Sequence, residues 1–140
     1  MKRILVGLDG SPRAARVLAV ATIIARAQDA KLTLVRAVGL PPEIPQDLWK
    51  TTDESLLGVL QRHAQEGLDA QAAGIPAELA GDRLVVVGVP WQAVCETAGR
   101  IDAELVVVGS HGYSGFDRLL GTTAAKIVNH ATCSVLVVRA

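Results

Sequence analysis

Five short, continuous apolar segments constrain most strongly what this chain can fold into. Alternating apolar and polar residues would indicate strands with one solvated face, whereas continuous apolar runs are typical of strands covered on both faces. The five segments are residues 4–8, 32–35, 84–88, 105–109 and 135–138. We therefore expect five parallel strands with helices on both faces of their sheet.

Four helices are expected in the intervals between these strands. Apolar residues recur at helical spacing in residues 11–28, 52–73, 90–100 and 122–131. In the first of them, Ser11 is expected to cap the helix and Pro12 to be its first residue. The alternation of strands and helices predicts an α/β fold, a doubly wound five-stranded parallel sheet with right-handed crossovers. The pattern leaves open whether residues 77–83 extend the third strand or precede it.

Length and composition limit the remaining possibilities. The 140 residues suffice for one domain with its own core, so we expect residues 1–140 to form a single α/β domain. Lys plus Arg and Asp plus Glu number 14 each, which argues against a nucleic-acid partner because such proteins usually show a basic surplus. No apolar run approaches a membrane span, and residues 1–10 read as a first strand rather than a signal peptide. Cys95 and Cys133 lack metal-ligand spacing, so we expect reduced, structural thiols and a cytoplasmic location.

The segment after the fourth strand is unusually rich in glycine. Four glycines occur in or just after that strand: Gly109, Gly112, Gly115 and Gly121. Glycines let backbone N–H groups approach an anion closely. Thr122 and Thr123 would open a helix whose N-terminus favours phosphate. The residues alone support a phosphate site and a plain connecting loop about equally.

In a doubly wound sheet, ligands bind outside the carboxyl ends of the strands where the strand order reverses. If the first and fourth strands flank that point, residues 8–12 meet residues 109–115 there. Asp9 could then accept hydrogen bonds from adenine or ribose, hold Mg²⁺ near phosphates, or merely end a buried strand. His111 could approach phosphate or face solvent. No set of residues at meaningful spacing indicates nucleophilic catalysis.

At these positions the chain resembles the universal stress protein family. The resemblance covers nearly the whole chain and is carried by residues 4–21, 88–112 and 133–139. The nucleotide-binding branch of that family has a glycine, two residues, a second glycine, nine residues, and then Gly followed by Ser or Thr. Gly109, Gly112 and the pair Gly121-Thr122 match this pattern with eight intervening residues in place of nine.

The resemblance implies an ATP-binding regulatory protein of the stress response, with slow or no hydrolysis, which uses ATP (or else ADP or AMP) and Mg²⁺. It implies that Asp9 contacts the adenine side, that Ala37 offers backbone to the adenine edge, and that Gly109 contacts the ribose. Gly7 stands where the family usually has proline. The candidate binding residues are Gly7, Asp9, Ala37, Gly109, Ser110, His111, Gly112, Gly121, Thr122 and Thr123, with Asp9 also the candidate metal ligand.

The last apolar run, residues 134–139, is expected to be an exposed edge of the sheet. An unpaired apolar edge invites association unless it is covered. The resemblance implies a homodimer through this final strand. The alternative function is a dimeric interaction module of the same type that does not bind nucleotide.

Overall fold

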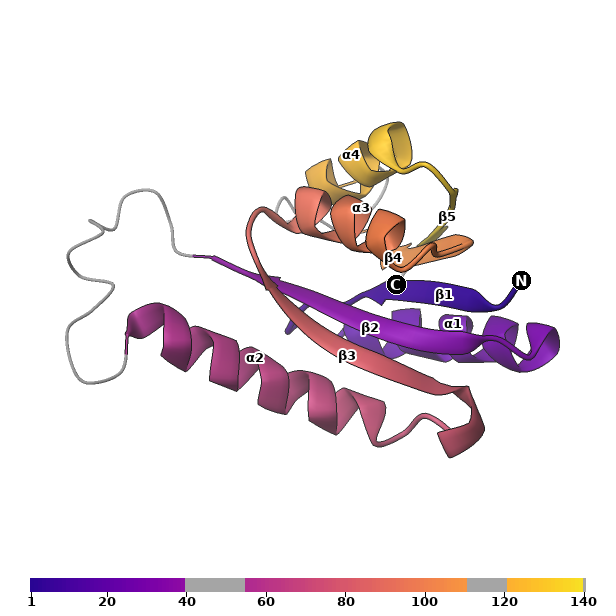
Figure 1. Ribbon diagram of the computed structural model, residues 1–140, viewed down its shortest axis with the longest axis horizontal. Helices are drawn as coiled ribbons and strands as arrows, with labels where there is room; N and C mark the ends of the chain where they lie inside the picture. Colours follow the sequence, from indigo (N-terminus) through magenta and orange to yellow (C-terminus); the bar gives the residue numbers. More distant parts are fainter. Residues whose placement is uncertain (40–54, 111–120, 140) are drawn as a thin grey trace.

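A computed structural model describes residues 1–39, 55–110 and 121–139 (Figure 1). The described elements, in chain order, are β1 (Arg3–Gly7), α1 (Ala14–Gln28), β2 (Lys31–Val38), α2 (Leu56–Ala72), the 3₁₀ helix η2 (Ala77–Leu79), β3 (Ala80–Val87), α3 (Pro90–Arg100), β4 (Leu105–Gly109), α4 (Thr122–His130) and β5 (Ser134–Val138). The five strands form one sheet in the order β3-β2-β1-β4-β5, and every neighbouring pair is parallel. The predicted doubly wound α/β fold is confirmed.

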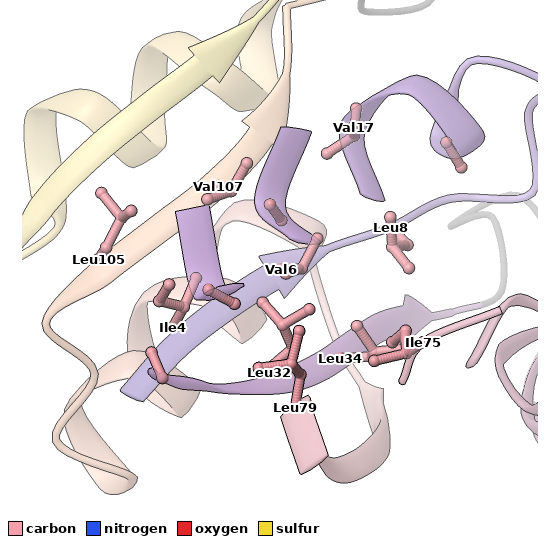
Figure 2. Packing of buried hydrophobic residues seen from close by; sticks show 14 of the residues in the cluster. Ile4, Val6, Leu8, Val17, Leu32, Leu34, Ile75, Leu79, Leu105 and Val107 are labelled. Atoms are coloured by element: carbon pink, nitrogen blue, oxygen red, sulfur yellow. The ribbon is translucent and has the colours of Figure 1, made fainter. Parts of the chain in front are cut away.

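Helices cover both faces of this sheet, which explains the continuous apolar runs of its central strands. Figure 1 shows α3 and α4 on one side and α1 and α2 on the other. Along β1, Ile4 and Val6 join the cluster under α1 and α2, which Figure 2 shows from close by. Leu5, between them, belongs to the second cluster under α3 and α4. Because successive side chains of a strand alternate between faces, each of these three positions of β1 meets a core.

The first helix begins later than the sequence suggests. Its N-cap is Arg13, so the expectation that Ser11 caps the helix and Pro12 opens it is wrong. The Ser11 N–H instead donates to the Asp9 carboxylate Oδ1 at 2.9 Å. An aspartate that binds the backbone two residues on fixes a turn. That turn delays the start of α1 to Ala14.

The structure also settles the boundaries of the third strand and the second helix. Ala80 begins β3, and the residues before it form η2. The register shifts between Leu32 and Leu34 of β2, which marks a bulge in the ladder with β3. Helix α2 begins at Leu56, where the Ser55 hydroxyl accepts from the Gly58 N–H at 3.0 Å. The expected start of that helix at residues 52–54 lies outside the described residues.

Within the described ranges, none of the helices has both the length and the apolar character needed to cross a membrane.

Candidate functional site

The sequence places its ligand site where the strand order reverses, and the structure has a cavity there. Strand β1 lies between β2 and β4, so the chain runs outward from β1 in both directions. Beyond the carboxyl ends of these strands is a cavity of about 360 Å³. Its described lining residues are Gly7, Leu8, Asp9, Ser11, Arg13, Ala14, Val17, Val35, Ala37, Pro90, Val94, Val108, Gly109, Thr123, Ala124 and Ile127. This volume is typical of pockets for small organic ligands.

Half of the candidate residues named from the sequence converge on this cavity. Gly7, Asp9, Ala37, Gly109 and Thr123 line it, although they come from β1, the loop after it, β2, β4 and α4. Parallel strands bring these positions together because their carboxyl ends share one edge of the sheet.

The remaining candidates lie elsewhere or outside the described residues. Ser110 is buried, its N–H donates to the Val138 carbonyl at 2.8 Å, and its own carbonyl accepts from the Gly121 N–H at 2.8 Å. Ser110 and Gly121 therefore connect β4, β5 and α4, and neither lines the cavity. Thr122 is exposed and also does not line it. His111 and Gly112 lie outside the described residues.

Glycine at position 7 allows close packing beneath the cavity. A Cβ atom added there would lie 3.0 Å from a methyl carbon of Val108 and 3.3 Å from one of Val94. Val94 and Val108 occupy the space that a side chain at this position would need. A side chain at position 7 would therefore require Val94 and Val108 to move.

Asp9 is held by its neighbours on both sides. Its Oδ1 accepts from the Ser11 N–H, and its backbone carbonyl accepts from Gln71 Nε2 of α2 at 3.4 Å. Asp9 is nevertheless exposed, so its carboxylate reaches solvent at the rim of the cavity. Among the described lining residues, Asp9 carries the one negative charge and Arg13 the one positive charge.

Sequence reasoning missed much of the lining. Val17, Val94 and Ile127 read as core residues, and they are buried, yet each also faces the cavity. Arg13 was not among the residues named from the sequence. No sequence signal marked Arg13, because the turn at Asp9 and the start of α1 just after Arg13 are features of the structure.

The arrangement suits binding better than acid–base chemistry. Its walls are mainly aliphatic, with few polar groups, as in sites that orient a ligand. Burial raises the pKa of the Cys95 thiol, with smaller contributions from Cys133 and Glu96, and burial also raises the pKa of Cys133. Both cysteines are free thiols, as expected, and neither lines the cavity. A divalent cation beside Asp9 would need further ligands from the bound molecule and from water.

Comparisons with known proteins show the family of this chain. The model of the universal stress protein family matches residues 1–139. The chain belongs to the universal stress protein family. A universal stress protein of Thermus aquaticus is 35% identical over 140 residues, which cover 99% of this chain and 98% of the relative.

Solved structures of the family show the same fold. Universal stress protein UspA from Lactobacillus plantarum is 26% identical and superimposes with a TM-score of 0.82, covering 99% of this chain and 97% of the other. A second universal stress protein, solved in complex with cAMP, is 31% identical with a TM-score of 0.65. The match covers 98% of this chain and 96% of that one.

Proposed function

We propose that this universal stress protein binds an adenine nucleotide in the cavity, with ATP and Mg²⁺ as the ligand pair, and acts as a regulatory protein of the stress response. The observation that carries the proposal is the convergence of Gly7, Asp9, Ala37, Gly109 and Thr123 on one cavity at the reversal of strand order. The relative solved with cAMP supports the adenine-nucleotide class. ADP and AMP are the competing ligands.

The residues present fit such a ligand. Val35, Val94 and Val108 offer apolar surface to a base, and the backbone near Ala37 offers polar groups to its edge. The ribose would contact Gly109. Thr123 lies in the first turn of α4, where backbone N–H groups and the helix dipole favour phosphate. Mg²⁺ would neutralise phosphate charge, and Asp9 could supply one carboxylate oxygen to it.

Thermal unfolding with and without nucleotide tests this function. Saturating ATP with Mg²⁺, at about a hundred times Kd, should stabilise the folded state by about 2.7 kcal/mol and raise Tm. Asp9→Asn keeps the oxygen that accepts from Ser11 but removes the charge, so it should weaken ATP binding without changing the turn. Asp82→Asn, a change at an exposed carboxylate of β3, is the matched control.

The Asp9 variant also separates two roles. A loss of ATP affinity seen only with Mg²⁺ would indicate a metal ligand, whereas the same loss without Mg²⁺ would indicate contact with base or ribose. If the folded protein shows no rise in Tm at millimolar ATP, the nucleotide proposal fails. The interaction module without nucleotide would then be the better interpretation.

We also propose that the protein is a homodimer joined through β5 and that it acts in the cytoplasm. Strand β5 lies at one end of the strand order, as expected from the sequence, and Val135, Leu136 and Val137 are only partly buried. Antiparallel pairing of two such strands would satisfy their free backbone groups. The free thiols of Cys95 and Cys133 suit a reducing compartment.

A further inference from the structure

Arg13 lies at the rim of the cavity, where it has no evident structural task. It is exposed, and it is the one cation among the described lining residues. It occupies the N-cap position of α1, and its side chain makes no capping hydrogen bond. Within the described ranges, no hydrogen bond or ion pair engages its guanidinium.

Helix stability does not explain an arginine at this position. The N-terminus of a helix carries the positive end of its dipole, so a cation there is unfavourable. Ser, Thr, Asp and Asn are the side chains that cap a helix start, because they accept hydrogen bonds from its free N–H groups. A guanidinium only donates, and it therefore adds to the unmet donors at the start of α1.

The packing of α1 directs this position toward the end of β4. A Cβ atom added to Gly109 would lie 3.3 Å from a methyl carbon of Val17, so Val17 packs against the last residue of β4. Residues four apart share one face of a helix, and helical side chains tilt toward the N-terminus. Arg13, one turn before Val17, lies on the same face of α1, and it lines the same cavity as Gly109.

A second group that attracts anions lies in the wall of the same cavity. Thr123 and Ala124 of α4 line it, and they belong to the first turn of that helix. Helix α1 packs on one face of the sheet and α4 on the other, so the two helix starts flank the carboxyl end of β4. An anionic group above Gly109 would have the Arg13 guanidinium on one side and the N-terminus of α4 on the other.

We propose that Arg13 binds the phosphate groups of the nucleotide and makes the site prefer nucleotides over the uncharged nucleoside. This inference rests on the proposed nucleotide binding. A guanidinium presents paired N–H donors in a plane that match two phosphate oxygens. The contribution of Arg13 to ligand affinity grows with the negative charge of the ligand. It is therefore larger for ATP than for AMP and is absent for adenosine.

Titration calorimetry of two matched variants tests the role of Arg13. Arg13→Gln removes the charge at the cavity, and Arg16→Gln removes an exposed charge from the same helix outside the cavity lining. The affinity of Arg13→Gln for ATP should fall about tenfold, as expected for one lost charge-assisted contact of about 1.4 kcal/mol. The loss should be smaller for AMP and undetectable for adenosine, while Arg16→Gln should bind all three ligands as the unmodified protein does.

A salt series adds a second measurement. Raising the salt concentration should weaken ATP binding to the unmodified protein more steeply than binding to Arg13→Gln, because salt screens the contact that the variant lacks. Equal ATP affinity in Arg13→Gln and the unmodified protein overturns the role of Arg13 while nucleotide binding stands. An equal loss for adenosine, or an equal effect of Arg16→Gln, also overturns it. Failure of the unmodified protein to bind any of the ligands rejects both proposals.

Discussion

The two edges of the sheet, β3 and β5, have opposite chemistry. Strand β3 includes Asp82 and Arg83, begins beside a bulge against β2, and exposes its first four residues. Strand β5 has the sequence SVLVV, without a charge, and three of its residues are partly buried. Charges and bulges prevent an edge from pairing with another chain, whereas a flat apolar edge favours pairing. The sheet is thus protected at one edge and left open to association at the other.

The geometry of hydrogen bonding sharpens this contrast. In parallel sheets, alternate residues direct their N–H and C=O groups to opposite sides. The Val138 carbonyl accepts from Ser110, so Val138 faces β4, and Val137 directs its backbone groups outward. On the other edge, the Gly88 N–H donates to the Val38 carbonyl, which leaves Val85, three residues earlier, facing outward.

The largest expected effect comes from proline at these two outward-facing positions. Val137→Pro removes an outward N–H without breaking the ladder between β4 and β5. A symmetric dimer contains the change twice, so its dissociation constant should rise by about thirtyfold, which corresponds to about 2 kcal/mol. Sedimentation velocity over a range of protein concentrations measures this shift.

Val85→Pro is the matched control on the protected edge. It should leave the dimer intact, because β3 takes no part in the proposed interface. If both variants dissociate equally, or if the unmodified protein is already a monomer at tens of micromolar, the β5 dimer is rejected.

The next effect tests the bulge that shapes the β3 edge. A Cβ atom on Gly81 would lie 2.8 Å from the carbonyl oxygen of Leu32, a backbone atom that cannot move away alone. Gly81→Ala should therefore lower the free energy of unfolding by about 1–3 kcal/mol, as overpacking does. Gly99→Ala, on α3 with no atom within 4 Å of the new Cβ, should instead raise it by about 0.4–1 kcal/mol. Urea unfolding compares the two, and a Gly81→Ala protein as stable as the unmodified one would mean that the bulge does not depend on glycine.

The difference between buried and exposed strands also explains which parts of the fold could be predicted from the sequence. The central strands were predicted well because β1 and β4 are buried on both faces and so read as continuous apolar runs. The start of β3 could not be predicted from the sequence. Gly81, Asp82 and Arg83 lie on an exposed edge, so this part of the strand has no apolar run. The later start of α1 depends on a side-chain turn that propensities do not reveal.

Some residues of the candidate site could likewise be predicted from the sequence, and others could not. Gly7, Asp9 and Gly109 could be identified because a packed core does not require glycines or an aspartate at the ends of its strands. Val94 and Ile127 were not, since an apolar residue facing a cavity has the same sequence pattern as one facing the core. Arg13 needed the packing of α1 against β4, which is a tertiary contact.

The smallest expected effect concerns the charge on the protected edge. Arg83 Nη1 of β3 lies 3.1 Å from Asp69 Oδ1 of α2, and both side chains are about half exposed. The same carboxylate oxygen accepts from Gln65 Nε2 at 3.0 Å, so Asp69 keeps a partner when Arg83 is replaced.

Exposed ion pairs contribute little to stability, and Arg83→Leu should lower the free energy of unfolding by less than about 1 kcal/mol. Urea unfolding at low and high salt measures this, and the difference between the two proteins should shrink as salt screens the pair. The variant should also make β3 more like β5, so light scattering at increasing protein concentration should detect more association than in the unmodified protein. A larger loss of stability without new association would show that Arg83 anchors α2 to β3 rather than protecting the edge.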